Sequence, residues 1–242
     1  TGSGKSTTLY TALKEIQRDD INIVTVENPV EMILPGITQV DINDKAGLTF
    51  ANVLRSILRQ DPDVIMIGEI RDRETAEIAS SAAITGHLVL STLHTYSAAS
   101  SIIRLVDMGI APFMVTSAVL GIVAQRLVRK LCLNCREAYY ASEDELRFLG
   151  LPPGTKQKIY REKGCDKCNR TGVKGRTAVH EIMRVTAPIR AAIHAGESTA
   201  HINEIALKEG MLPMLENLRR LVLNGTISIA TMLNAAINDD IL

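Results

Sequence analysis

Short apolar runs alternate with stretches of helical spacing along the first hundred residues of the chain. The runs of strand length cover residues 21–26, 64–67 and 88–93. Helical patterns cover residues 7–18, 50–59 and 74–84. Strands that alternate with helices predict a parallel sheet with helices on both of its faces. Because ligands of such sheets bind where the strands end, we expect catalytic side chains directly after each apolar run.

Beyond residue 100 the pattern is less regular. Residues 108–125 carry no formal charge but contain Gly109, Pro112 and Gly121, which favours a buried helix over a membrane span. The other predicted elements are a short strand around Ile159, an acidic turn at residues 143–145, and helices at residues 211–222 and 227–237. These patterns divide the chain into a core at residues 1–125, a cysteine-bearing module at 126–180 and a C-terminal helical part at 181–242.

Composition narrows the class of protein. The 242 residues are 46% apolar, which supplies a core and excludes disorder as the main state. Basic and acidic residues balance at 27 each, and only 3% of residues are aromatic, so binding nucleic acid over the whole surface or by stacking is disfavoured. Four cysteines are too few for a disulfide scaffold of this length. With no secretory leader pattern in the sequence, we expect a cytoplasmic protein.

The first seven residues carry the ending of a phosphate-binding loop, G-x-x-x-x-G-K-[ST]. Glycines let the backbone N–H groups turn toward phosphate oxygens, Lys5 adds a point charge, and Ser6 is placed to bind Mg²⁺. The candidate nucleotide-binding residues are Gly2, Ser3, Gly4, Lys5, Ser6 and Thr7. By the motif's spacing its first glycine would precede Thr1, so we expect the sequence to be a fragment. The alternative is a glycine-rich turn that only caps a helix.

Two acidic segments follow predicted strands. The first reads Glu27-Asn28-Pro29-Val30-Glu31, where Pro29 ends the strand and two carboxylates could face a nucleotide or simply form an acidic surface turn. The second is Gly68-Glu69 after four apolar residues, a Walker B arrangement with glycine where many such enzymes have a metal-binding Asp. Glu69 is therefore the expected base for an attacking water, unless it serves only in a salt bridge.

Two histidines flank the third apolar run. His94 follows the run and could reach the terminal phosphate, whereas His87 precedes it and is the weaker nucleotide-binding candidate. A lone histidine is more often structural, so both depend on the neighbouring motifs. Arg71, two residues after Glu69, completes the candidate catalytic set of Glu27, Glu31, Glu69, Arg71 and His94.

The cysteines form two Cys-x-x-Cys pairs, Cys132 with Cys135 and Cys165 with Cys168, separated by 29 residues. Two such pairs suit tetrahedral Zn²⁺, although disulfides or a redox pair remain open. Residues 126–176 hold 13 Lys plus Arg against six Asp plus Glu. That excess would suit nucleic acid, acidic lipid headgroups, a docking partner or a solvated face.

The ordered motifs resemble one family, the type II secretion and type IV pilus assembly ATPases of the secretion ATPase superfamily. The resemblance is carried by the loop, by Glu27-Asn28-Pro29-Val30-Glu31, by Gly68-Glu69-Ile70-Arg71-Asp72, by the stretch from Thr85 to Thr95, and by the four cysteines. Asn28 departs from the family's usual Glu-Asp-Pro. The resemblance implies an α/β fold with a RecA-like core and a mostly parallel sheet, an inserted zinc-binding hairpin module and a C-terminal helical bundle.

The same resemblance implies a function. It predicts a homo-hexameric motor using ATP, Mg²⁺ and Zn²⁺, peripheral on the inner membrane, that contacts a membrane platform protein and drives pilin or pseudopilin assembly. A fragment should be weakly active, because missing upstream parts supply arginines and part of the adenine pocket. The alternative is a nucleic-acid-handling zinc protein, such as a DNA uptake or transfer ATPase, although no nucleic acid is expected. A small-molecule kinase is disfavoured, since no acceptor site is evident.

Overall fold

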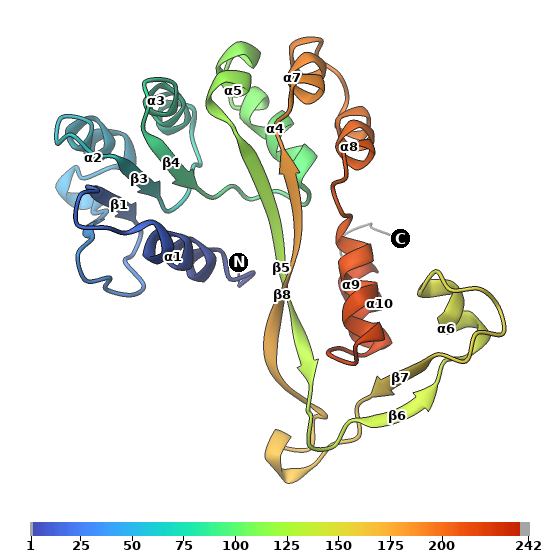
Figure 1. Ribbon diagram of the computed structural model, residues 1–242. Coiled ribbons are helices and arrows are strands. Elements are labelled where there is room, and N and C mark those ends of the chain that lie inside the picture. The colour runs from blue at the N-terminus through green and yellow to red at the C-terminus, as the bar shows by residue number, and fades with distance from the viewer. Residues whose placement is uncertain (1, 238–242) are drawn as a thin grey trace. The chain divides into compact units, whose positions relative to one another are not determined.

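The computed structural model describes residues 2–237 (Figure 1). The helices are α1 (Lys5–Ile16), α2 (Phe50–Ile57), α3 (Arg73–Ile84), α4 (Ala98–Asp107), α5 (Pro112–Ala118), α6 (Glu143–Phe148), α7 (Ala187–His194), α8 (Thr199–Lys208), α9 (Met214–Leu223) and α10 (Ile229–Ile237). The strands are β1 (Ile23–Glu27), β2 (Thr38–Asp41), β3 (Val64–Ile67), β4 (Leu88–Ser91), β5 (Gly121–Leu131), β6 (Glu137–Tyr140), β7 (Lys158–Arg161) and β8 (Val173–Arg184). Short 3₁₀ turns occupy Asp44–Ala46 and Asp166–Cys168.

The backbone contacts gather these elements into two units. The core unit comprises Gly4–Ala124 and Ile182–Met211. The cysteine unit comprises, among described residues, 2–3, 125–181 and 212–237. The division into three parts predicted from the sequence stays a prediction. The boundaries of the two units lie at other residues, because α7 and α8 pack with α4 and α5, whereas α9 contacts β7.

A parallel sheet of order β2-β1-β3-β4 forms the centre of the core unit (Figure 1). Alternation along each strand sends Val24 and Val26 to one face, where they pack with apolar residues of α2 and α3. Ile23 of β1 and Met66 of β3 face the opposite side, where they pack with Leu13 of α1. Both faces are therefore covered, and the predicted parallel α/β sheet is confirmed.

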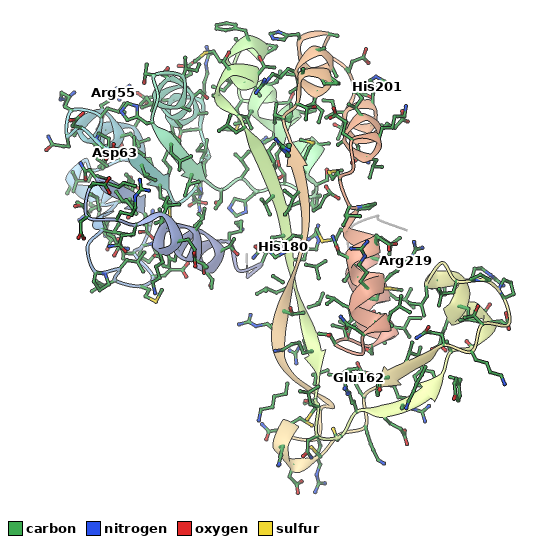
Figure 2. The ribbon with its side chains drawn as sticks, viewed as in Figure 1. Arg55, Asp63, Glu162, His180, His201 and Arg219 are labelled. Atoms are coloured by element: carbon green, nitrogen blue, oxygen red, sulfur yellow. The ribbon has the colours of Figure 1, made fainter. Side chains whose placement is uncertain are left out.

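Polar side chains fix where the helices begin. Asp72 accepts the N–H of Thr75 at 2.8 Å and starts α3. Ser97 and Ser100 form a reciprocal capping box at the start of α4. Across the surface, Arg55 of α2 pairs with Glu74 of α3 at 2.5 Å (Figure 2). Because the Arg55–Glu74 ion pair is exposed, it contributes little to stability.

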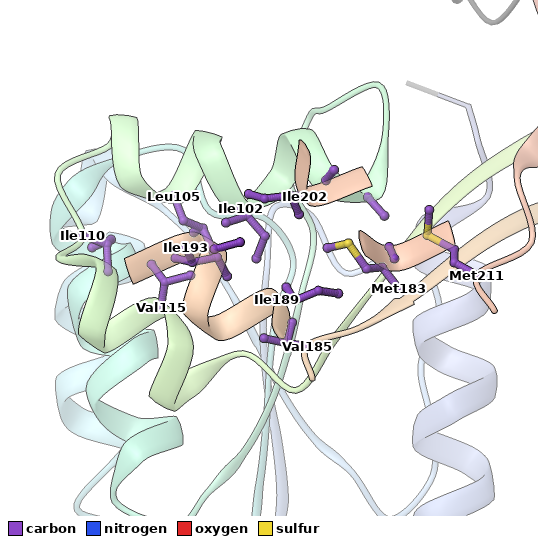
Figure 3. Close-up of a cluster of buried hydrophobic side chains, with 14 of the residues drawn as sticks. Ile102, Leu105, Ile110, Val115, Met183, Val185, Ile189, Ile193, Ile202 and Met211 are labelled. Atoms are coloured by element: carbon purple, nitrogen blue, oxygen red, sulfur yellow. The ribbon is translucent and has the colours of Figure 1, made fainter. Parts of the chain in front are cut away.

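A second apolar cluster of the core unit joins α4, α5, α7 and α8 (Figure 3). Its buried aliphatic side chains come from segments about ninety residues apart in sequence and include Ile102, Ile110, Val115, Ile189, Ile193 and Ile202. This packing explains why residues after the cysteine module return to the core unit: an amphipathic pair such as α7 and α8 needs an apolar partner.

The structure corrects two predicted elements. The helix expected over residues 108–125 is wrong, because α5 ends at Ala118 and β5 begins at Gly121, where the segment becomes β-branched and pairs with β8. The acidic turn at residues 143–145 is instead the start of α6, capped by Ser142 and Glu145. No helix among residues 2–237 has the length and apolarity needed to span a membrane.

The cysteine unit is held by short polar and aromatic contacts. Strands β6 and β7 pair antiparallel, with Tyr139 opposite Ile159, which confirms the predicted strand near Ile159. The Arg136 guanidinium lies over the Tyr160 ring at 4.3 Å and donates to the carbonyl of Gly225 at 2.5 Å. Ser228 donates to Glu162 at 2.5 Å, the latter labelled in Figure 2. These contacts join the hairpin to the chain around α9 and α10.

The packing of β3 gives a first prediction. Ile65 is completely buried at the centre of the sheet, so Ile65→Ala should lower the free energy of unfolding by about 2–5 kcal/mol through lost contacts and a cavity. Ile33 is 83% exposed, so Ile33→Ala is the matched control and should change stability by less than about 0.5 kcal/mol. Urea unfolding followed by circular dichroism measures both, and equal losses would contradict the assigned core.

Candidate active site

The phosphate-loop residues lead directly into α1. Gly2 and Gly4 both have φ of 82°, a left-handed conformation that glycine adopts without steric cost. Gly4 is the N-cap of α1, and it makes no side-chain capping bond. Lys5, Ser6 and Thr7 form the first turn, where the helix dipole favours an anion. The two glycine conformations and the start of α1 are compatible with phosphate binding, which stays a prediction for these residues, while Thr1 lies outside the described residues.

The loop that follows β1 reaches α1 through Ser6. The Ser6 hydroxyl donates to Oε1 of Glu31 at 2.9 Å. Ser6 lies in the first turn of α1, and Glu31 lies in the loop that follows β1. The structure thus brings the predicted magnesium ligand and one predicted carboxylate together.

Glu27, the other carboxylate of that segment, has a different environment. It is 4% exposed and faces α1 from the last position of β1. Its carboxylate accepts hydrogen bonds from the hydroxyls of Tyr10 and Thr25 and from the amide of Gln39. Burial and the bond to Glu27 raise the pKa of Tyr10 to about 12, so the tyrosine stays a hydrogen-bond donor at neutral pH.

Gly68 stands where β3 ends, beside the end of β1. Its N–H donates to the carbonyl of Val26 at 2.7 Å. A Cβ built on Gly68 would lie 3.3 Å from that carbonyl oxygen and 3.4 Å from Cα of Glu27. The crowding gives a physical reason for glycine at this position, since any larger residue would push the two strand ends apart.

Glu69 is clamped by two basic side chains. Its side chain is 14% exposed, with Arg71 at 2.5 Å on Oε1 and His94 Nε2 at 3.1 Å on Oε2. Burial by itself raises the pKa of Glu69, but hydrogen bonds and charge from Arg71 and His94 outweigh it and hold the pKa below its usual value. Glu69 is therefore a carboxylate at neutral pH, which a general base must be.

The two histidines lie at opposite ends of β4. His94 follows the strand's carboxyl end, and its Nε2 lies 3.1 Å from Glu69, which also pairs with Arg71. His87 precedes Leu88, and its Nδ1 lies 3.0 Å from the carbonyl of Ala82 near the end of α3. The structure does not bring His87 to the group formed by Glu69, Arg71 and His94.

The four cysteine sulfurs of the cysteine unit lie within 4.8 Å of one another. The Sγ atoms of Cys135 and Cys168 are 3.8 Å apart, as are those of Cys165 and Cys168, and Cys132 lies 4.0 Å from Cys165. Four sulfurs at about 2.3 Å around a tetrahedral Zn²⁺ would be about 3.8 Å apart. The donor set and its spacing therefore fit zinc.

Backbone N–H groups also prepare this cluster for a cation. Burial opposes ionisation of Cys168, but N–H groups of Cys165 and Gly172 donate to its sulfur and lower its pKa to about 6. Burial and the neighbouring sulfurs raise the pKa of Cys135 to about 12. Without a cation the four sulfurs cannot all carry negative charge at such short range.

Tyr10 and Gln39 are the residues that the sequence interpretation missed. Tyr10 lies on α1, three residues after the phosphate loop, and was assigned no role, and Gln39 lies on β2 in a segment for which no strand was predicted. Neither belongs to a recognisable spacing. Only the parallel pairing of β2 with β1, which sets Gln39 opposite Thr25, brings Gln39 to Glu27.

Residues 1–234 match the family model described as "Type II/IV secretion system protein". The chain belongs to this family. Type II secretion system protein E of Dickeya dadantii is 54% identical to this family member over 198 residues, 82% of the chain and 39% of the relative. Type IV pilus assembly ATPase PilB of Thermus thermophilus is 50% identical over 219 residues, 90% of the chain and 25% of the relative. The chain thus spans less than half the length of these relatives.

Solved structures share the fold of this secretion-system family member. The pilus retraction motor PilT, with bound ADP, matches with a TM-score of 0.73 and 28% identity, over 100% of this chain and 60% of that one. The ATPase DotB of Legionella pneumophila matches with a TM-score of 0.70 and 23% identity, over 98% and 58%, which shows the shared fold alone. The resemblance inferred from the motifs is confirmed.

The clamp on Glu69 gives a second prediction. Because Arg71 lowers the pKa of Glu69, Arg71→Ala should raise that pKa, whereas Arg73→Ala, which removes a partner of Glu77, should leave it unchanged. Carbon-13 NMR of the glutamate carboxyls during a pH titration measures the midpoint.

The sign of the pH effect follows from the lowered pKa in the folded state. The ionised Glu69 favours folding above its unfolded pKa, and this contribution is lost as pH falls through the lower folded value. In Arg71→Ala the folded pKa lies closer to the unfolded one, so the contribution should be smaller and its loss should be complete at a higher pH. An unchanged midpoint in Arg71→Ala would contradict the clamp.

Proposed function

We propose that the chain is the catalytic part of an ATP-hydrolysing motor that powers pilin or pseudopilin assembly in type IV pilus biogenesis or type II secretion. Glu69 carries the proposal: an ionised, largely buried carboxylate held by Arg71 and His94 at the carboxyl edge of a parallel sheet, where such folds bind ligands. The family membership, and the ATPase names of relatives at about 50% identity, support it.

The phosphate loop and the residues around Glu69 have separate roles in this proposal. Backbone N–H groups of residues 2–7 and the Lys5 ammonium would bind the ATP phosphates, and Ser6 would hold Mg²⁺, which neutralises charge on the phosphates when bound. Glu69 would accept a proton from the attacking water. Arg71 and His94 position that carboxylate and keep it ionised.

Substitution of Glu69 tests the proposal. In the full-length protein that carries this chain, Glu69→Gln removes the base but keeps the side chain's size, so ATP turnover should fall by about 10²–10⁴-fold. Nucleotide binding should persist, because Glu69 does not belong to the phosphate loop. The control Glu15→Gln alters an exposed carboxylate of α1 and should leave turnover unchanged. Full activity in Glu69→Gln would rule out the assigned role.

The proposal extends to assembly and location. A homo-hexamer that acts at the cytoplasmic face of the inner membrane, against a platform protein of the secretion or pilus machine, accords with the machinery named in the relatives. The chain alone should hydrolyse ATP more slowly than the full-length protein, since it spans less than half of those relatives.

A nucleic-acid-handling motor is the second candidate. It is favoured by a cavity of about 510 Å³ in the cysteine unit, whose lining includes Lys130, Arg136, Lys167 and Lys174. Against it, the rings of Tyr160 and Tyr139 are covered by Arg136 and Arg161, at 4.3 and 5.3 Å, so these faces do not offer stacking surfaces. Salt-dependent DNA binding that survives Glu69→Gln and outweighs ATP turnover would favour this candidate.

We also propose that Cys132, Cys135, Cys165 and Cys168 bind one structural Zn²⁺. Protein purified without chelator should contain about one zinc per chain by mass spectrometry, and Cys165→Ser should lose most of it. Removing the metal should lower the melting temperature of the cysteine unit and make the thiols reactive to Ellman's reagent. Stoichiometric disulfide in protein prepared under reducing conditions, with no zinc, would contradict the assignment.

A further inference from the structure

Glu27 and Glu31, the two glutamates that flank Pro29, have different hydrogen-bond partners and therefore different roles. We propose that Glu31 is the outer-sphere acceptor that orients the Ser6 hydroxyl toward Mg²⁺, and that Tyr10, Glu27 and Gln39 are positioning residues that hold Glu31 in place. The acidic loop is defined as residues 28–34. This inference rests on the proposed function, because it assigns roles within the same nucleotide site.

The carboxylate of Glu27 accepts hydrogen bonds from three protein side chains. Its Oε1 accepts from Thr25 at 2.6 Å and from Gln39 at 3.1 Å, and its Oε2 accepts from Tyr10. A carboxylate has about four lone-pair sites, so three donors and an exposure of only 4% leave little of Glu27 accessible to a metal or a water. Glu27 is therefore a fixed point at the end of β1, whereas the sequence interpretation grouped it with the catalytic residues.

Tyr10 transmits the position of Glu27 to the acidic loop. The Tyr10 hydroxyl donates its only proton in the hydrogen bond to Glu27, so toward the acidic loop it can act only as an acceptor. The backbone N–H of Glu31 donates to that oxygen at 3.1 Å. Because the pKa of Tyr10 is raised, its hydroxyl stays protonated, so it continues to donate to Glu27 and to accept from the N–H of Glu31. Because Tyr10 lies on α1, the backbone of Glu31 is fixed relative to the helix that carries Ser6.

Gln39 holds the other side of the acidic loop. Its Oε1 accepts the N–H of Leu34 at 2.6 Å, and its Nε2 donates both to the carbonyl of Met32 and to Glu27, each at 3.1 Å. These bonds define one orientation of the amide, because an exchange of its oxygen and nitrogen would oppose donor to donor. The loop is therefore anchored on both sides of Glu31.

The position of Glu31 determines how the Ser6 hydroxyl is oriented. With its backbone held, Glu31 accepts a hydrogen bond from the Ser6 hydroxyl, with the two oxygens 2.9 Å apart, which leaves the lone pairs of the Ser6 oxygen available to a cation. Acceptors of this kind orient metal ligands, and their removal typically costs 10–100-fold in metal affinity. A network that only stabilised the fold would not change metal affinity in this selective way.

Metal-dependent nucleotide binding tests the inference in the full-length protein. ADP affinity is measured by calorimetry with and without Mg²⁺, and Mn²⁺ affinity in the ADP complex by electron paramagnetic resonance. Tyr10→Phe and Gln39→Leu should weaken Mn²⁺ binding about 10–100-fold while metal-free ADP affinity changes less than about twofold. Gln17→Leu is the matched control, because the Gln17 amide donates to the carbonyl of Pro35 just outside the acidic loop, and it should leave Mn²⁺ affinity unchanged.

The variant Glu31→Ala separates loss of metal binding from loss of folding. Glu31 is exposed, so this variant should fold normally and still show the loss of Mn²⁺ affinity. Unchanged Mn²⁺ affinity in Glu31→Ala, with a wild type that binds Mn²⁺ and ADP, would overturn the inference and leave the proposed function standing. A wild type that binds neither would instead overturn the proposed function.

Discussion

The parallel register between β1 and β3 is the constraint on which the site depends. Val26 lies opposite Ile67, so the residues that follow, Glu27 and Gly68, end their strands side by side. The bond from the Gly68 N–H to the Val26 carbonyl continues the pairing one step beyond β3. A shift of the register by one residue would turn Glu27 away from α1 and move Glu69 along the edge. One set of backbone hydrogen bonds therefore positions both acidic segments.

The partners of each carboxylate, rather than its residue type, decide its chemistry. Glu27 is surrounded by neutral donors and is buried, which suits a fixed structural acceptor. Glu69 has two basic neighbours and stays ionised, which suits a proton acceptor. Glu31 is exposed and accepts from a hydroxyl on α1, which suits a residue that works through another ligand. Three glutamates near one edge can thus serve in three ways.

Much of the core and part of the site could be predicted from the sequence. Residues 64–67 form β3 as predicted, because an apolar run of four residues is too short for a helix and has the length of a buried strand. The phosphate loop, Glu69 and the cysteine pairs have fixed spacings that carry their chemistry. The rest depends on distant partners. The contact of Gln39 with Glu27 follows only from the pairing of β2 with β1. Residues 121–131 form a strand because β8, some fifty residues later, supplies its hydrogen-bond partners.

The cysteine cluster shows how local chemistry can link distant parts of one unit. Cys132 donates its N–H to the carbonyl of Gly172 at 2.9 Å, and Leu131 beside it donates to the carbonyl of Thr226 at the same distance. Arg136, four residues after Cys132, donates to the carbonyl of Gly225, and its guanidinium lies over the Tyr160 ring. A metal that fixed the knuckle of Cys132 and Cys135 would therefore also restrain the turn between α9 and α10. Since metal binding couples to folding, the stability of that turn should depend on the four sulfurs.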